Sequence, residues 1–231
     1  MRIPRLHDWD LTPAEGRALQ ERLAQQIRLV PLPEGICLVA GADVAFSKDR
    51  GLVFASVVLL TFPGLEELEQ SNAHVACTFP YVPGLLSFRE GPALVAAFRR
   101  LKGTPDAIML DGQGLAHPRR MGLASHVGLW LGVPTVGCAK SRLTGRHGEP
   151  GREKGCVTPL LDGDEQIGTV LRSRTGVRPL YVSPGHLADF DTSTRLVLEC
   201  CRRYRLPEPT RQAHLAVSRF KRDYQEAHRQ A

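Results

Sequence analysis

The sequence contains no Cys-x-x-Cys pair, although six of its 231 residues are cysteines. The ligand spacing of common zinc sites is therefore missing, and a zinc centre is not expected. Cys200 and Cys201 are adjacent, and the remaining cysteines fall within apolar runs. We interpret them as small buried side chains of a protein from a reducing compartment.

Long hydrophobic runs are also missing. No stretch of about 18 apolar residues occurs, so we expect no membrane span and no membrane partner. The first ten residues, MRIPRLHDWD, lack the apolar core of a signal peptide, and the expected location is the cytoplasm. Repeats and low-complexity segments are absent as well, and we expect one large domain over residues 1–231.

Acidic residues are the minority among the charged ones. The chain has 24 Asp and Glu against 30 Lys and Arg, which gives a formal net charge of +6. A basic excess suits a polyanionic partner such as nucleic acid, but solvated helix faces explain it equally well.

The order of apolar runs, turns and helical repeats predicts a mixed α/β fold. Thr12 and Glu15 frame a helix start with a capping box, and Ser87 and Glu90 predict a second one. Three strands joined by short turns predict an antiparallel meander, and later strands alternate with helices as in a parallel sheet. The expected strands are 36–46, 52–61, 66–78, 106–112, 133–139, 157–160, 166–172 and 180–183, and the expected helices are 12–28, 87–101, 122–132, 192–203 and 210–228.

Three carboxylates are candidates for chemistry. Asp43 lies in the apolar run 36–46, Glu90 in the first turn of the following helix, and Asp111 at the end of the fourth expected strand. If the first and fourth strands are neighbours, Asp43 and Asp111 face each other where polar sites of such sheets gather. Clustered carboxylates repel one another, and oxygen ligands alone favour Mg²⁺ or Mn²⁺, ions that serve displacement at phosphate.

Each of the three acids also has a structural explanation. Asp43 ends its strand and caps a turn, Glu90 completes a capping box, and Asp111 turns the chain into Gly112. The residues alone leave both explanations open.

The loop after Asp111 is rich in glycine and basic residues. Its glycines allow a close approach of backbone to a ligand, and His117, Arg119 and Arg120 are positioned in sequence to meet phosphate. Lys140 directly follows another buried strand and is a further candidate. The structural alternatives are a hydrogen-bonded core histidine and a lysine that extends into solvent. The loop lacks the third glycine and the acidic partner of a dinucleotide-binding motif, which excludes that function.

Four runs of the sequence resemble the endonuclease V family of repair nucleases. They are FPYVPGLLSFREGPAL, DGQGLAHPRRMGLASHVGLWLGVPTVGCAKSRLTG, YVSPGH and RLPEPTRQAH, and the resemblance extends from Leu6 to about His214. It implies the ribonuclease H-like fold and a metal-dependent endodeoxyribonuclease that acts on damaged DNA. The implied reaction is cleavage at the second phosphodiester bond 3′ to a deoxyinosine, with Mg²⁺ or Mn²⁺, leaving 3′-hydroxyl and 5′-phosphate ends.

The resemblance also assigns roles to individual residues. It implies that Asp43 and Asp111 are metal ligands and that Glu90 is the catalytic glutamate. His214 matches a fourth polar position, where a histidine suits Mg²⁺ less well and acts through water or orients a nucleophile. Tyr81 matches an aromatic wedge that fills the space of a flipped base.

The remaining implied residues surround the scissile phosphate and the base. His117 and Lys140 are expected near the phosphate. The residues expected to contact the DNA or form the pocket for the lesion, beside Tyr81, are Pro80, Pro83, Gly84, Leu85, Leu86, Gly112 and Leu143. The tail after His214 is expected to be only a basic helix.

The expected partner is deoxyinosine-containing DNA, and two alternatives to a DNA repair endonuclease stay open. One is a nuclease that acts on inosine in RNA, and the other is a lesion-binding module without catalysis. The complete set of three acids disfavours the second, because a binding module needs no carboxylates facing phosphate. We expect the protein to act as a monomer.

Overall fold

Apolar residues fill the central strands on both faces, so the chain needs helices on either side of its sheet. The computed structural model describes residues 3–47 and 49–228; residues 1, 2, 48 and 229–231 of the expected domain lie outside this part. The strands are β1 (Leu38–Ser47), β2 (Leu52–Thr61), β3 (Glu67–Ala76), β4 (Ala107–Leu110), β5 (Thr135–Ala139), β6 (Val157–Asp162), β7 (Glu165–Leu171) and β8 (Leu180–Pro184). The helices are α1 (Pro13–Ala24), α2 (Leu86–Arg100), α3 (Leu123–Leu131), α4 (Phe190–Glu199) and α5 (Glu208–Ala227).

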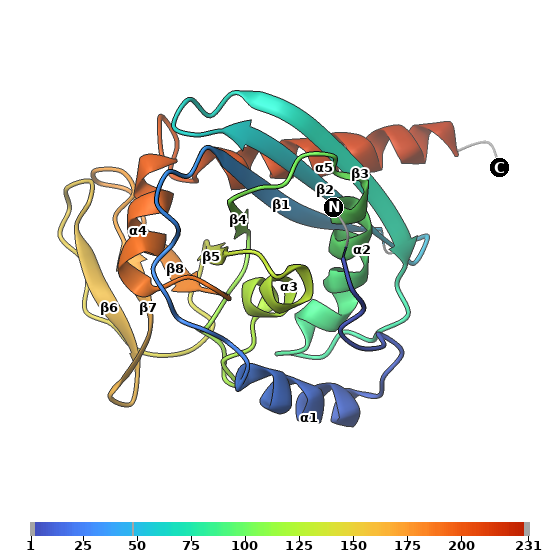
Figure 1. Cartoon of the computed structure of the whole chain (residues 1–231), viewed down its shortest axis with the longest axis horizontal. Coiled ribbons are helices and arrows are strands. Elements are labelled where there is room, and N and C mark those ends of the chain that lie inside the picture. The colour runs from blue at the N-terminus through green and yellow to red at the C-terminus, as the bar shows by residue number, and fades with distance from the viewer. Residues whose placement is uncertain (1–2, 48, 229–231) are drawn as a thin grey trace.

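The strands form one mixed sheet in the order β3-β2-β1-β4-β5-β8-β7-β6 (Figure 1). β1, β2 and β3 pair antiparallel, which confirms the predicted meander. β4 pairs in parallel with both β1 and β5, and β8, β7 and β6 continue antiparallel. The mixed α/β fold is confirmed, and the first and fourth strands are neighbours.

Alternate residues of each central strand enter different cores. Ala40 and Ala42 of β1 pack with residues of α2 and α3, whereas Val39 packs with residues of α4 and α5. Figure 1 shows α2 and α3 on one side of the sheet and α5 crossing the other side behind β1 and β2. No helix in the described part of the chain has both the length and the apolar character needed to cross a membrane.

The structure corrects three local predictions. Glu90 completes no capping box: α2 begins at Leu86 without a side-chain cap, because the Ser87 hydroxyl bonds to the ring of His126 instead. The first helix has its predicted cap but ends at Ala24, well before residue 28. The prediction that all cysteines are buried is wrong for Cys37, which directly precedes β1 and is exposed.

Glycine at position 41 allows α5 to reach the sheet. A Cβ atom added to Gly41 would lie 1.9 Å from the carbonyl oxygen of Pro209, in the first turn of α5. Any larger residue at position 41 would therefore push the start of α5 away. This close approach also carries His214, one turn further along α5, over β1.

We predict that Gly41→Ala lowers the free energy of unfolding by about 2 kcal/mol or more, because overpacking against backbone cannot be relieved by a side-chain rotation. Urea unfolding measures the change. Gly148→Ala is the matched control, since a Cβ there meets nothing within 4 Å and the backbone lacks a positive φ. Equal stability of both variants would contradict the role of Gly41.

Candidate active site

The parallel pairing of β1 with β4 sets two carboxylates side by side. Ala42 lies opposite Leu110 in the register, so the next residue of each strand is Asp43 and Asp111, respectively. Oδ1 of Asp43 accepts a hydrogen bond from the Val44 amide at 2.8 Å. The two carboxylates therefore lie side by side where β4 ends and β1 continues past it, and this region is the first candidate site.

Each carboxylate also faces a basic side chain from another element. Nδ1 of His214 on α5 donates to Oδ2 of Asp43 at 2.8 Å, and the histidine is half exposed. Lys140, just after β5, forms an ion pair with Oδ2 of Asp111. The structure thus brings together four of the predicted catalytic residues, as two acid–base pairs.

Glu90 of α2 joins the two aspartates. Burial raises the pKa of Glu90 to about 8, with the negative charges of Asp43 and Asp111 adding to the shift. The pKa of Asp43 is raised as well, chiefly by burial, while the hydrogen bond from His214 lowers it. Three acids therefore share one region whose own cations do not fully compensate them.

The donor set fits a hard divalent cation that needs few protein ligands. Within residues 3–47 and 49–228, no three His, Cys, Asp or Glu side chains form a cluster suited to an ion. Mg²⁺ does not require such a cage, because it keeps several waters and takes one or two carboxylates together with substrate phosphate. The neighbouring pair Asp43 and Asp111 meets this requirement.

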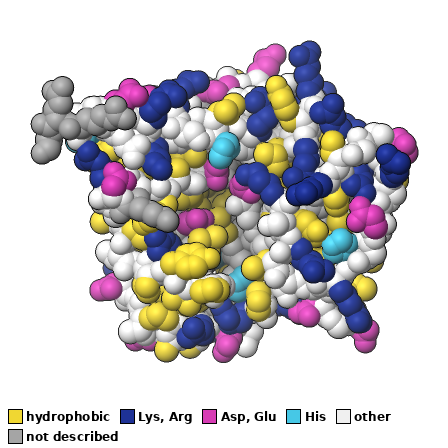
Figure 2. Space-filling model, turned by 180° about the vertical axis from the view of Figure 1, so that it is seen from behind, with side chains coloured by type: hydrophobic (Ala, Val, Ile, Leu, Met, Phe, Trp, Pro, Cys, Tyr) yellow, Lys and Arg dark blue, Asp and Glu magenta, His cyan; other side chains and the backbone are white. Residues whose placement is uncertain are grey.

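A cavity of about 400 Å³ opens beside the carboxylates. It shares Asp111 and Lys140 with the site just described, and it lies between the loops before α2 and α3 and the segment after β5. Six of the residues predicted to bind the lesion line it, namely Tyr81, Pro83, Gly84, Leu86, Gly112 and Leu143; Pro80 and Leu85 do not. Figure 2 shows the face opposite to that of Figure 1, where hydrophobic side chains gather beside a central hollow and Lys and Arg lie on its other side.

Large apolar side chains at the rim of this cavity face solvent. Tyr81 is 73% exposed and Leu143 is 53% exposed, and they reach the rim from separate loops. Such exposed apolar groups around a hollow are typical of a binding surface.

His117 lies in the cavity wall and is almost fully buried. Its Nε2 donates to the carbonyl oxygen of Gly84 at 3.0 Å, and its Nδ1 accepts from the amide of Arg119 at 3.2 Å. Burial, followed by the charge of Arg119, lowers the pKa of His117 to about 4. Both ring nitrogens are thus engaged within the protein, and the histidine lines the same cavity as Asp111 and Lys140.

Sequence analysis missed Gln20, which reaches the cavity from α1. Its side-chain amide donates to the carbonyl oxygens of Gly84 at 3.0 Å and Met121 at 3.1 Å, and its oxygen accepts from Nε of Arg119 at 2.6 Å. Nη2 of Arg119 also donates to Gly84, whose φ of +77° few other residues adopt. The available signal was the spacing Gly16, Leu19, Gln20, Leu23, which puts a polar residue on the buried stripe of the helix.

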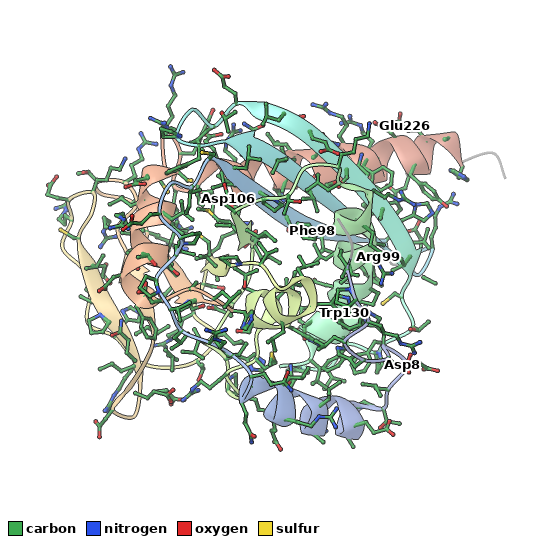
Figure 3. The ribbon with its side chains drawn as sticks, in the orientation of Figure 1. Asp8, Phe98, Arg99, Asp106, Trp130 and Glu226 are labelled. Carbon is green, nitrogen blue, oxygen red and sulfur yellow. The ribbon has the colours of Figure 1, made fainter. Side chains whose placement is uncertain are left out.

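A second network of polar side chains was also not predicted, and it runs from the N-terminal segment to the cavity wall. His7 contacts His126 of α3 between their Nε2 atoms at 2.6 Å, and Nδ1 of His126 contacts the hydroxyl of Ser87 at 2.9 Å. Trp9 stacks on Trp130 next to these rings at 4.5 Å between centroids. Figure 3 labels Trp130 on α3 and Asp8 in the N-terminal segment. Nothing in the spacing of these residues signalled the contact, because 119 positions separate the two histidines.

Comparison with known proteins gives a consistent result. Residues 21–215 match the family model described as Endonuclease V. The chain is 48% identical over 220 residues to the endonuclease V of Dehalococcoides mccartyi, covering 95% of this chain and 99% of that protein. It is 50% identical over 212 residues to that of Gloeobacter violaceus, covering 90% and 86%.

Solved structures show the same likeness. The crystal structure of endonuclease V from Streptomyces avermitilis superposes with a TM-score of 0.90 at 41% identity, covering 94% of this chain and 96% of that one. The catalytic domain of human endonuclease V superposes with a TM-score of 0.85 at 32% identity, covering 91% and 96%. A Ciona intestinalis endonuclease V, in complex with a 23mer DNA containing an inosine followed by a ribo-adenosine, gives 0.81 at 25% identity and covers 93% and 100%.

The buried histidine of α3 predicts a loss of stability in acid. Burial lowers the pKa of His126 from 6.5 to about 3, so the proton binds the unfolded chain more readily than the folded one. The contribution of the neutral ring is complete above pH 6.5 and is lost as the pH falls below it, at up to about 1.4 kcal/mol per pH unit. We expect the stability difference between the wild type and His126→Asn, which does not titrate, to shrink over this range in urea unfolding. A constant difference from pH 7 to pH 4.5 would contradict a neutral buried ring.

Proposed function

The chain belongs to the endonuclease V family, and we propose that it is a repair endonuclease that nicks DNA beside a deaminated base, with deoxyinosine as its main substrate. The observation that carries the proposal is the shared border of two sites: Asp111 and Lys140 belong both to the carboxylate cluster and to the cavity. A base held in the cavity would therefore have its 3′ phosphates next to the acids. The inosine-containing DNA in the Ciona intestinalis relative supports the choice of base.

The acidic residues would carry the chemistry. Asp43 and Asp111 would hold Mg²⁺, with Mn²⁺ as a substitute, and the ion would activate water and neutralise charge on the leaving oxygen. Burial raises the pKa of Glu90 to about 8, close enough to the working pH for this group to exchange a proton with the attacking water. His214 holds the Asp43 carboxylate through its hydrogen bond, and its half-exposed ring can orient water at the same place.

The basic residue of the cluster would hold the phosphate. Lys140 is 42% exposed beside Asp111, so its ammonium can meet a phosphate oxygen without leaving the ion pair. His117 is assigned to the wall of the base pocket, since its hydrogen bonds to Gly84 and Arg119 occupy both nitrogens. The expected cut is the second phosphodiester bond 3′ to the lesion, leaving 3′-hydroxyl and 5′-phosphate ends.

The exposed rim of the cavity would open the duplex. A base enters a pocket only after it leaves the stack, and an aromatic side chain can replace the lost stacking. Tyr81, at the tip of the loop that Gly84 closes, has the exposure this role needs. We propose that residues 1–231 act as one catalytic domain and as a monomer.

RNA containing inosine is the second candidate substrate. The DNA bound to the Ciona intestinalis relative carries a ribonucleotide directly after the inosine, so a 2′-hydroxyl next to the lesion is compatible with that site. Matched DNA and RNA strands with a single inosine distinguish the two substrates, and a faster cut in RNA would reverse our order of preference.

The first test is Asp43→Asn in a denaturing-gel nicking assay. The substrate is an end-labelled duplex with one central deoxyinosine, incubated with Mg²⁺ or with EDTA. We expect a fall in rate of at least about 100-fold, because the variant loses a ligand charge, with binding of the lesion still measurable. Asp164→Asn, in the turn between β6 and β7, is a control that should keep the wild-type rate. Retained cleavage in Asp43→Asn would refute the metal assignment, and binding without any nick in the wild type would favour a lesion-binding module.

The second test separates base flipping from chemistry. Tyr81→Ala should weaken binding to a deoxyinosine duplex about tenfold or more, since stacking of a base on an aromatic ring contributes about 1–3 kcal/mol. The effect should be smaller on a single strand, where no partner strand has to be held open. Tyr204→Ala removes a second exposed tyrosine, which does not line the cavity, and serves as the control. An equal loss on single and double strands would contradict a wedge role.

A further inference from the structure

Ser87 occupies a special place in the cavity wall. It is the second residue of α2, it lines the cavity, and it is 2% exposed. A buried hydroxyl takes the orientation that its hydrogen-bond partners impose, and the partner here is Nδ1 of His126. Which of the two atoms carries the proton decides what Ser87 can offer to a ligand.

The direction of this hydrogen bond follows from the other end of the hydrogen-bonded series Ser87–His126–His7. Nδ1 of His7 lies 2.7 Å from the carbonyl oxygen of Asp8. A carbonyl oxygen only accepts, so His7 carries its proton on Nδ1, and Nε2 of a neutral His7 has only a lone pair. Nε2 of His126, at 2.6 Å from it, must therefore be the donor.

The second histidine passes this direction on to the serine. A neutral His126 with its proton on Nε2 has a lone pair on Nδ1. The hydroxyl of Ser87, 2.9 Å away, must then donate its proton to that nitrogen. The oxygen of Ser87 is left with lone pairs alone, and it can only accept hydrogen bonds from anything bound in the cavity.

Both rings are in surroundings that keep them neutral. Trp9, Trp130 and Phe88 pack around His7 within 6.0 Å of its centroid. Burial lowers the pKa of His7 to about 4 and that of His126 to about 3, and neither ring has a carboxylate as a hydrogen-bond partner.

We propose that Ser87 is a specificity-determining residue that accepts a hydrogen bond from an N–H group on the edge of the bound base, and that His7 and His126 are positioning residues that fix this polarity. The inference rests on the proposed function, because it concerns the base that enters the cavity. It adds the Ser87 side chain to the recognition of that base and specifies that its oxygen accepts the hydrogen bond.

The chemistry of deamination makes this direction useful. Hypoxanthine carries a hydrogen on N1, whereas adenine, from which it arises, has a lone pair there. An acceptor-only oxygen stabilises the first and repels the second. Guanine also carries hydrogen on N1, so Ser87 separates hypoxanthine from adenine and leaves the rejection of guanine to other parts of the wall. Sites that hydrogen-bond a substrate group discriminate strongly against analogues that leave the site unpaired.

The experiment measures dissociation constants of the full-length protein in EDTA for single-stranded oligonucleotides. Each carries one central hypoxanthine, 1-methylhypoxanthine or adenine. We expect Ser87→Ala to lose affinity for hypoxanthine by roughly tenfold and to lose little for the other two bases, as expected for a single hydrogen bond. Ser193→Ala is the matched control, since Ser193 is a fully buried serine on α4 whose hydroxyl has no partner among the described residues.

Two variants of His126 test the relay. His126→Leu removes the acceptor, so the Ser87 hydroxyl is free to donate, and the ratio of adenine to hypoxanthine affinity should rise by roughly tenfold. His126→Asn places an amide oxygen near the former Nδ1 and should restore most of the discrimination. A merely structural role of His126 would change affinity for all three bases alike.

The outcomes separate this inference from the proposed function. If the wild type binds hypoxanthine and adenine equally, the proposed substrate and this inference both fail. If the wild type prefers hypoxanthine and nicks beside it, but Ser87→Ala keeps the same preference, only the role of Ser87 is refuted. A selective loss in Ser87→Ala together with rescue in His126→Asn supports the complete relay.

Discussion

Two like charges lie side by side because β1 and β4 pair in parallel with Ala42 opposite Leu110. The strands cannot separate Asp43 from Asp111 without breaking the centre of the sheet, so the repulsion has to be met by what surrounds them. α5 brings His214 to one carboxylate, and the end of β5 brings Lys140 to the other. Burial and the charges of the two aspartates raise the pKa of Glu90 to about 8, and the pair Asp43 and Asp111 would attract a divalent cation.

The end of β4 borders both the carboxylate cluster and the cavity. Asp111 closes β4, and Gly112 and Gln113, which follow at once, line the cavity. Because Asp111 and Gly112 are adjacent in the chain, the backbone at the end of β4 would fix the distance between a nucleotide in the cavity and this acid. Gly41 contributes from the neighbouring strand, because its missing side chain lets α5 lie against β1. The geometry of the site is thus largely a property of the sheet.

Much of this was predictable from the sequence, and the exceptions have physical reasons. Apolar runs and turns predicted the strands and made Asp43 and Asp111 candidates, and the resemblance to the endonuclease V family assigned them to the site. The predicted capping box at Ser87 was wrong. Cap motifs describe local contacts, whereas the Ser87 hydroxyl forms its hydrogen bond with His126 on another helix. Gln20 and His7 were missed for a related reason. The helical spacing marks Gln20 as buried, but the partners of Gln20 and His7 lie 64 and 119 positions away, and no local pattern identifies them.

Histidine shows most clearly why environment, and not residue type, decides a role. His214 is half exposed and donates to a carboxylate, whereas His117 and His126 are buried and neutral. His117 forms part of the cavity wall, and His126 lies behind it as the hydrogen-bond partner of Ser87. The two supports of the cavity that come from the N-terminal region, His7 and Gln20, both precede the family-matched residues 21–215. The segment before the matched region therefore has a physical function: it holds the Gly84 carbonyl through Gln20 and sets the direction of the Ser87 hydroxyl through His7. The direction of the Ser87 hydroxyl would in turn decide which hydrogen bonds a base in the cavity can make.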